Sequence, residues 1–150
     1  MNQVTDEYSS ETKDLEPCLY LSLRKANRVM SQIYDHYMAD CGIKGSQFSI
    51  LRATYLLKTT TNKALQEILV LDQTTLSRNL KPLIRDNLIV SRFGQDRRFK
   101  ELALSKEGLD LYKKAAQRWQ AAQREIKEKL GADNTALIHS LSDIVVSLKG

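Results

Sequence analysis

Residues 71–108 read LDQTTLSRNLKPLIRDNLIVSRFGQDRRFKELALSKEG, and this stretch decides the fold. Asp72 is a favourable helix N-cap, and apolar side chains recur after it at helical spacing. We therefore predict a helix that runs to about Asn87. Pro82 lies inside this helix and leaves its C-terminal boundary open, because proline can end or bend a helix.

A β-hairpin with a basic tip is predicted directly after this helix. Residues 88–90 are apolar, residues 93–96 are turn-like, and residues 100–104 alternate between apolar and polar side chains. Ser105 can cap the long helix that follows, and Gly131 is its predicted end. The succession of helices and hairpin is typical of a winged helix-turn-helix.

The flanking sequence predicts further helices. A long amphipathic helix is expected over about residues 17–41, with Gly42 as the residue that stops it. Ser46 is the predicted N-cap of the next helix, and the polar residues 58–62 form a linker before a short helix. A last helix is predicted to begin at an Asp133 cap.

The chain of 150 residues has the size of one domain, and 42% of it is hydrophobic, which is enough for a core. We expect a mainly α fold with a small β-hairpin wing. Residues 1–14 are predicted to be an acidic flexible tail, and residues 15–150 to form the domain.

The charge distribution favours a nucleic-acid partner. The chain has 23 Lys and Arg residues against 18 Asp and Glu residues, for a net charge of +5. Residues 1–17 have a net charge of −4, so the rest of the chain carries +9. Residues 72–100 alone hold seven bases and three acids. Such a segment attracts phosphate, although an ordinary solvated surface is the alternative explanation.

Other classes of function lack the residues that they need. No apolar run reaches the length of about 18 residues that a membrane span requires, and the N-terminus has no signal-peptide core. No nucleophile elbow, zinc-protease or nucleotide-binding motif occurs, and the two cysteines lack the spacing of a zinc site. We expect a cytoplasmic protein without a membrane segment, catalytic residues, cofactor or metal.

Residues 71–108 resemble the recognition helix, the wing and the following helix of MarR-type transcriptional regulators. The family pattern is Asp-x-(Ser/Thr)-(Ser/Thr)-hydrophobic-(Ser/Thr)-Arg-x-Leu, then Gly-hydrophobic-hydrophobic, Asp-x-Arg and Leu-(Ser/Thr)-x-x-Gly. The matching residues are Asp72, Thr74, Thr75, Leu76, Ser77, Arg78, Leu80, Leu88, Ile89, Asp96, Arg98, Leu104, Ser105 and Gly108. The resemblance spans roughly residues 17–148. It implies a winged helix at about 46–104 and dimerisation helices at about 17–41 and 105–148.

Three positions depart from this family pattern. Val70 stands in a turn where glycine is common, Asn62 stands where an apolar strand residue is usual, and Asn87 replaces a glycine before the wing. Asparagine tolerates a left-handed backbone, so the change at Asn87 is mild. A β-branched residue resists positive φ, so Val70 leaves the tightness of its turn open.

The recognition helix and the wing are predicted to contact double-stranded DNA. Small hydroxyls can approach phosphates, Gln and Arg can make bidentate contacts to bases, and Arg suits a narrow minor groove. The candidate DNA-binding residues are Gln73, Thr74, Thr75, Ser77, Arg78, Lys81, Arg97 and Arg98. The resemblance implies that Asp96 pairs with a nearby arginine and shapes the wing. Arg78 is one candidate for that arginine.

A homodimer is the predicted assembly. The first and last helices have more apolar surface than one small winged domain covers. The residues expected to pair with their symmetry mates and with residues 17–25 are Leu137, Leu141, Ile144, Val145 and Leu148. Such a two-fold dimer reads a palindromic operator. A monomeric helical bundle is the alternative.

Two sensing mechanisms remain open. Cys18 is a candidate redox sensor, because a helix N-terminus favours the thiolate and certain MarR-type peroxide sensors have a cysteine there. A plain apolar role is the alternative. The resemblance also implies a possible small aromatic effector, whose candidate pocket is formed by Tyr34, Tyr37, Phe48, Arg52 and Trp119, with His36 a lesser candidate.

Taken together, these features predict a dimeric repressor that an aromatic effector or thiol oxidation releases from DNA. A winged-helix adaptor that binds a protein and not DNA is the alternative function.

Overall fold

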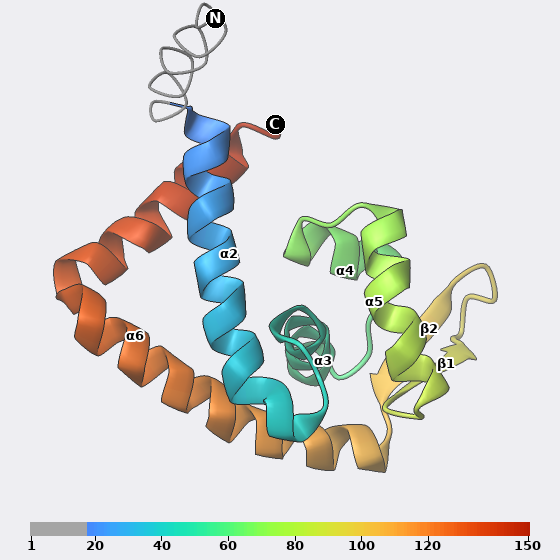
Figure 1. Cartoon of the computed structure of the whole chain (residues 1–150). Helices are drawn as coiled ribbons and strands as arrows, with labels where there is room; N and C mark the ends of the chain where they lie inside the picture. Colours follow the sequence, from blue (N-terminus) through green and yellow to red (C-terminus); the bar gives the residue numbers. More distant parts are fainter. Residues whose placement is uncertain (1–17) are drawn as a thin grey trace, which may run out of the picture.

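The computed structural model describes residues 18–150 (Figure 1). The predicted acidic tail at residues 1–14 lies outside the described residues. The elements in chain order are α2 (Leu19–Met38), the 3-10 turn η2 (Ala39–Cys41), α3 (Gly45–Leu57), α4 (Asn62–Leu69), α5 (Gln73–Arg85), β1 (Ile89–Phe93), β2 (Lys100–Leu104) and α6 (Lys106–Ser147). The predicted fold class, mainly helical with a two-stranded antiparallel wing, is confirmed.

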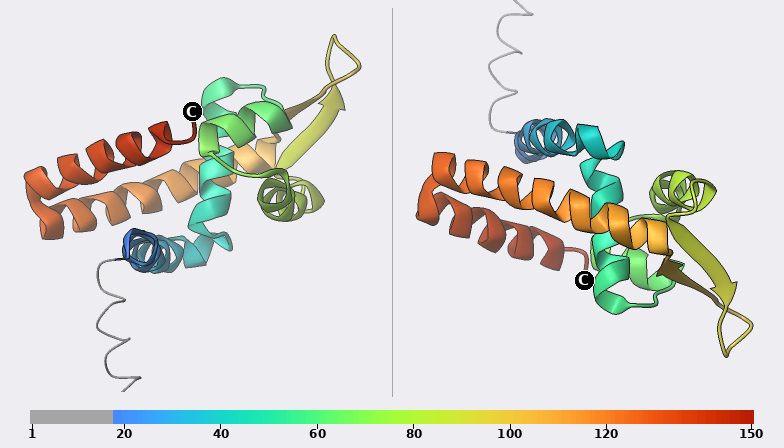
Figure 2. Two further views of the ribbon diagram at one scale, coloured as in Figure 1. Left: turned by 90° about the horizontal axis from the view of Figure 1, so that it is seen from above. Right: turned by 90° about the horizontal axis from the view of Figure 1, so that it is seen from below.

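The helices and the hairpin form a lobe and an arm (Figures 1 and 2). The lobe contains α3, α4, α5 and the wing, and the arm contains most of α2 and α6. The arm turns back sharply on itself within α6, at Gly131, whose φ of 81° and ψ of 166° are not helical. The predicted end at Gly131 is therefore a kink without a loop. Asp133 lies inside the helix, so its predicted cap role is wrong.

The helix caps around the recognition helix follow the prediction. The Asp72 carboxylate accepts a 2.7 Å hydrogen bond from the backbone N–H of Thr75. The Ser105 hydroxyl accepts a 2.9 Å bond from the N–H of Gly108. Helix α5 continues through its proline and ends at Arg85, two residues before the predicted boundary.

The predicted cap at Ser46 is wrong. Helix α3 already begins at Gly45, after Lys44 in an extended conformation. Ser46 lies in the first turn, and its hydroxyl hydrogen-bonds Asn79 Oδ1 of α5 at 3.2 Å. The Ser46 hydroxyl, which local sequence predicted as a helix cap, therefore donates to the side chain of Asn79 on the neighbouring helix.

A short β-bridge joins the wing to the segment between α3 and α4. Strands β1 and β2 pair antiparallel with Ser91 opposite Leu102. The backbone of Thr60 bonds Leu102 in both directions, at 2.9 and 2.8 Å. The position expected to be the strand residue, Asn62, is instead the first residue of α4. The residue that pairs with the wing is thus Thr60, two residues before the position that the family pattern predicted.

The core lies between α3, α4, α5, the hairpin and the first half of α6. Its buried residues are Met38, Ile43, Phe48, Ile50, Leu51, Ala53, Leu65, Leu76, Leu80, Leu83, Ile89, Leu102 and Ala115. Burial of these apolar side chains holds α5 and the wing in fixed positions relative to each other.

Val70 and Asn87, which stand where the family pattern has glycine, both adopt a left-handed backbone conformation. Asn87 has φ 57°, as asparagine tolerates. Val70, which ends α4, has φ 53° and ψ 49°, although its Cβ is branched. The N–H of Leu71 closes this turn on the Gln66 carbonyl at 2.9 Å. The turn before the recognition helix is therefore tight, and the tertiary fold imposes it on Val70.

We expect Val70→Gly to stabilise the protein by about 1 kcal/mol, because a left-handed L-residue costs about that much. The valine side chain is 44% exposed, so little packing is lost. Urea unfolding at fixed protein concentration measures the change. Val70→Ala is the matched control, since it keeps the Cβ and should gain much less. A lower stability for Val70→Gly would contradict the strain argument.

Candidate nucleic-acid interface

The exposed face of α5 carries hydroxyl and basic side chains. Thr74, Arg78 and Lys81 follow one another at spacings of four and three, on the side opposite the buried leucines. Arg85 continues the same face, a residue that the sequence analysis left out although its spacing from Arg78 places it there. Its guanidinium pairs with Asp86 at 2.9 Å, which leaves it less free to bind an anion.

The edges of this face are also polar. Gln73 and Ser77 are exposed on one edge, and Thr75 lies half-buried near Asn79 on the other. The Thr75 N–H that bonds the Asp72 carboxylate lowers the pKa of that carboxyl. The cap therefore stays ionised at neutral pH and holds the first turn of α5. The structure thus brings all six predicted residues of α5 onto its exposed or half-buried surface.

The wing tip is a tight turn organised by Asp96. The N–H of Phe99 donates to the Asp96 carbonyl at 3.1 Å. The Asp96 carboxylate accepts the backbone N–H of Arg98 at 3.1 Å and pairs with its guanidinium at 2.8 Å. The Arg98 hydrogen bond lowers the pKa of Asp96. The arginine that pairs with Asp96 is therefore Arg98 and not Arg78.

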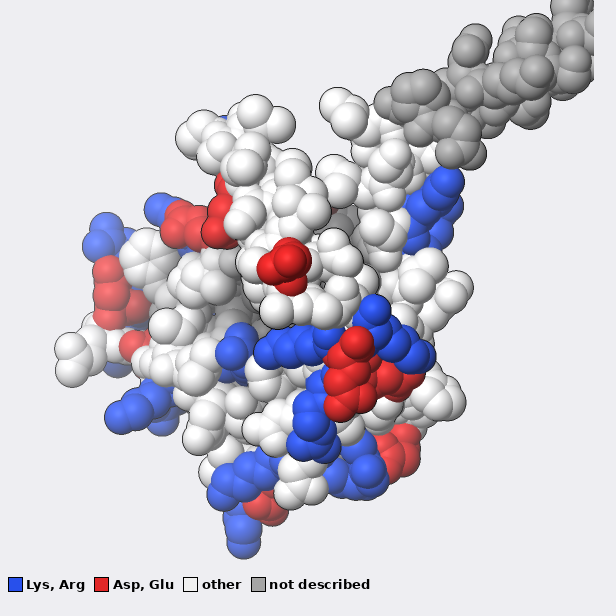
Figure 3. Space-filling model, turned by 90° about the vertical axis from the view of Figure 1, so that its left-hand side faces the viewer, with Lys and Arg blue, Asp and Glu red and all other residues white. Residues whose placement is uncertain are grey.

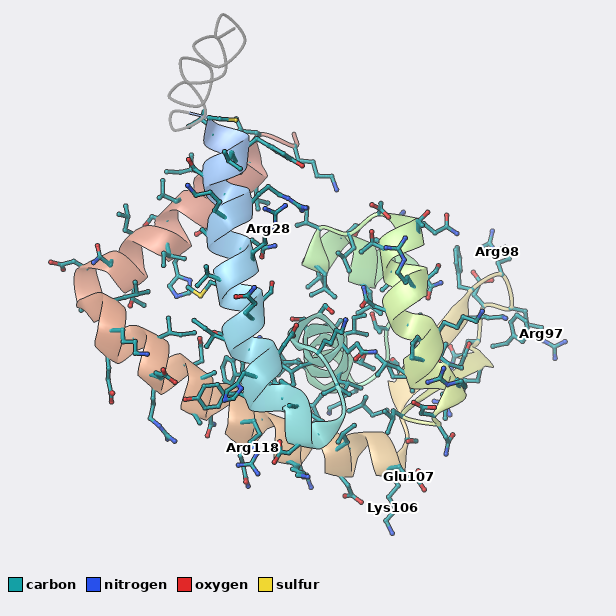
Figure 4. All side chains as sticks on the ribbon, in the orientation of Figure 1. Arg28, Arg97, Arg98, Lys106, Glu107 and Arg118 are labelled. Carbon is teal, nitrogen blue, oxygen red and sulfur yellow. The ribbon has the colours of Figure 1, made fainter. Side chains whose placement is uncertain are left out.

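Arg97 and Arg98 project from the outer end of the wing (Figure 4). Arg97 is exposed, and no ion pair engages it within residues 18–150. Arg98 is partly neutralised by Asp96, whereas Arg97 keeps its full charge for an outside anion. Of the two predicted wing contacts, Arg97 is therefore the stronger anion-binding group.

A cavity of about 730 Å³ lies between α2, α3, α4 and α6. Four of the five predicted effector residues line it, namely Tyr34, Phe48, Arg52 and Trp119. The Arg52 guanidinium lies 5.0 Å from the Trp119 ring centroid. No ion pair engages Arg52 in the described part of the chain. The cavity thus combines aromatic walls with one available cation.

Tyr37 lies outside this cavity. Its hydroxyl donates to the Glu125 carboxylate of α6, and His36 lies beside it in a separate polar hollow. Tyr34 also reaches α6, where its hydroxyl donates to Gln123 Oε1, and burial raises its pKa. Only Tyr34 of these two predicted tyrosines is placed to touch a molecule in the cavity.

The two cysteines are separated by the whole first helix. Cys18 is exposed and is the N-cap of α2, and its sulfur lies 3.5 Å from the N–H of Leu21. Cys41 is half-buried at the other end, and burial raises the pKa of its thiol. Helix α2 continues directly into η2, so a disulfide between Cys18 and Cys41 of one chain is excluded.

Comparison with solved structures identifies the type of fold. No protein-family model matches the chain, and no curated protein matches it significantly. The M. tuberculosis transcriptional regulator MosR in complex with DNA matches with a TM-score of 0.77 and 28% identity, over 89% of this chain and 99% of that one. The repressor CouR bound to a DNA duplex matches with a TM-score of 0.78 and 23% identity, over 88% and 95%. A mutant E. coli MarR in complex with operator DNA matches with a TM-score of 0.76 and 22% identity, over 85% and 92%.

The chain has the winged-helix fold of MarR-type regulators. The family resemblance predicted from the recognition helix and the wing is thereby confirmed. In the MarR-type description, α5 is the recognition helix and β1 with β2 is the wing.

This MarR-type chain exposes a large apolar surface on its arm. The exposed apolar side chains near the start of α2 and the end of α6 are Leu19, Tyr20, Leu23, Leu137, Ile138, Leu141, Ile144, Val145, Val146 and Leu148. Figure 3 shows few charged side chains over the upper part of this side, whereas Lys and Arg, interspersed with Asp and Glu, gather over the lower part. The residues predicted to pair with symmetry mates all belong to this exposed apolar surface.

Metal-binding clusters and membrane-spanning helices are absent from the described residues. No group of three or more His, Cys, Asp and Glu side chains within residues 18–150 is arranged to hold a metal ion. None of the described helices is long and apolar enough to cross a membrane.

Proposed function

We propose that this MarR-type chain is a sequence-specific DNA-binding transcriptional regulator that works in the cytoplasm as a homodimeric repressor. The exposed face of α5 carries this proposal, because Thr74, Arg78 and Lys81 form a row of hydroxyl and cationic groups on a rigid helix. Such a helix fits the major groove, where hydroxyls and lysines bind phosphates and arginine reads bases. The structurally similar MosR, CouR and MarR are all found in complexes with DNA.

The exposed apolar surface of the arm supports a homodimer. Side chains such as Leu19, Leu23 and Ile144 are more than half exposed in a single chain. A contiguous apolar surface of this kind marks a protein interface. A two-fold axis through the arm places two copies of α5 on the same side, where they read two halves of a palindrome about one helical turn apart.

The first test is binding to a labelled DNA fragment from upstream of its own coding sequence, with the protein reduced and peroxide-treated. Specific, salt-sensitive binding supports the regulator, and its loss on oxidation supports Cys18 as the sensor, with Cys18→Ser as the control variant. If the fragment is not bound, unbiased site selection tests distant operators. Failure of that selection contradicts the proposal and favours the protein-binding adaptor.

We expect Arg97→Ala to weaken binding to every DNA sequence and to lower the salt slope by about 0.9, which corresponds to one lost phosphate contact. Arg97 has its full charge and projects from the wing, so its loss removes one released counterion. Titrations at several salt concentrations measure the slope. Arg124→Ala, an exposed arginine on α6, is the control and should keep the wild-type slope. An unchanged slope for Arg97→Ala removes this residue from the interface.

The effector proposal rests on the 730 Å³ cavity. Its aromatic walls fit a small planar ring, and the Arg52 guanidinium over Trp119 fits a carboxylate or phenolate on that ring. An anion bound there contacts α2, α3 and α6 together. A ligand that changes how these helices pack also changes the distance between the two copies of α5, which lowers DNA affinity.

We expect benzoate or salicylate to quench the fluorescence of Trp119, which is the single tryptophan of the chain. Arg52→Gln should weaken this binding by about ten-fold, because a charge-assisted hydrogen bond is lost. Tyr37→Phe is the control, since Tyr37 lies outside the cavity. Equal affinity of Arg52→Gln and the wild type would show that the anion does not bind there.

A further inference from the structure

The outer end of the wing has a shallow hollow of about 450 Å³. It is lined by Phe93, Gly94 and Arg97. Phe93 lies on the same face of the hairpin as buried Ile89, because residues alternate along a strand. At the far end of β1 this face has passed the edge of the core, and Phe93 is 64% exposed. Phe93 therefore forms an aromatic wall of the hollow and is not part of the hydrophobic core.

Two cations, Arg97 and Lys100, and one acid, Glu101, lie around this hollow. Arg97 has no ion-pair partner among residues 18–150. Lys100, directly opposite Phe93 in the hairpin, holds its Nζ 5.7 Å from the ring centroid. The Glu101 side chain lies against Gly94, and its carboxylate is 4.0 Å from the guanidinium of Arg92, which offsets part of its charge. The ring of Phe93 thus shares the hollow with Arg97 and has Lys100 over its face, and neither cation has an ion-pair partner among residues 18–150.

We infer that this hollow binds one deoxyribose-phosphate unit of duplex DNA, with the ring of Phe93 against the sugar and the guanidinium of Arg97 on the phosphate. The apolar C–H face of a sugar fits an aromatic ring, and a phosphate oxygen fits the guanidinium. The inference rests on the proposed DNA-binding function. It assigns Phe93 to binding, a residue whose only role from sequence was its position in the turn of the wing.

A sugar-phosphate contact has a definite signature. It holds the wing on the backbone and reads no base, so it contributes equally to operator and unrelated DNA. Phe93 has no charge, so its loss changes affinity without changing the number of counterions released. Arg97 and Phe93 contact one nucleotide in this arrangement, so their substitutions should not be independent.

The test is a titration of full-length wild type, Phe93→Ala, Arg97→Ala and the double variant with the selected operator and an unrelated duplex, over a salt series. We expect Phe93→Ala to bind both duplexes about five-fold more weakly, with an unchanged salt slope. The double variant should lose less affinity than the product of the two single losses. Thermal unfolding of Phe93→Ala should match the wild type, because this ring packs on no core residue.

Phe99→Ala is the matched control. This neighbouring ring is also exposed, at 54%, but Arg98 covers it and it does not line the hollow. We expect its affinity to stay within about two-fold of the wild type, as for a surface change away from an interface. Wild-type affinity for Phe93→Ala, or an equal loss for Phe99→Ala, overturns the sugar-phosphate site. If the wild type binds neither duplex, the proposed DNA-binding function itself fails.

Discussion

Replacing Gly108 by alanine is expected to destabilise the fold by about 3 kcal/mol, at the upper end of the usual cost of overpacking. A Cβ at this position would lie 1.9 Å from the carbonyl oxygen of Leu88 and 2.8 Å from its carbonyl carbon. These are backbone atoms, so no side chain can turn away. The first turn of α6 would have to move from the start of the wing.

The same carbonyl shows why this movement is costly. Leu88 accepts the backbone N–H of Ser105 at 3.1 Å, so α6 and the wing are joined at this point. Urea unfolding at one protein concentration gives the free energy, which avoids the concentration dependence of a dimer. Lys113→Ala, an exposed position on α6, is the control and should change stability by less than about 0.5 kcal/mol. If Gly108→Ala lowers the free energy of unfolding by less than about 1 kcal/mol, the close contact between Gly108 and Leu88 does not determine stability.

Arg78→Ala is expected to lower affinity for the operator by about ten- to one-hundred-fold, the range of one bidentate base contact. Arg78 is exposed in the middle of α5, one turn from Thr74 and from Lys81. Because its predicted partner is a base edge, binding to unrelated DNA should fall much less. Operator and unrelated duplexes titrated at the same salt concentration give the ratio that measures this difference.

Arg85→Ala is the comparison that makes this result specific. Both arginines lie on the exposed face of α5, but Arg85 is near its C-terminal end and pairs with Asp86. We expect Arg85→Ala to lower the affinity for the operator by less than about three-fold, because the Arg85 guanidinium is paired with Asp86 and binds phosphate only weakly. If Arg85→Ala loses more than Arg78→Ala, the centre of α5 is not what reads the operator.

The order of elements could be predicted because its signals are local. The Asp72 and Ser105 caps each depend on a backbone N–H three residues away, and the helical spacing of apolar residues depends on its own turn. The row of Thr74, Arg78 and Lys81 on the exposed side of α5 follows from the same spacing. The family resemblance was carried by this same short region.

Two of the predictions that failed, at Ser46 and Asn62, concern contacts between distant segments. Ser46 bonds Asn79 of another helix and does not cap its own, and Thr60, not Asn62, bridges to the wing. The sequence left the turn at Val70 open, and there Val70 takes a backbone conformation that its side chain disfavours, because the packing of α4 and α5 on the core outweighs local preference. No pattern within a few residues contains this information.

By itself, the sequence determined the helices, the hairpin, the basic surplus and the exposed face of the recognition helix, since all of these depend on neighbouring residues or on composition. The tertiary structure alone decided which side chains meet. It paired Asp96 with Arg98, separated Tyr37 from the other cavity residues by bonding it to Glu125 of α6, and brought Gly108 against Leu88. Each of these outcomes depends on side-chain orientation or on close packing between elements, which periodicity along one chain does not specify.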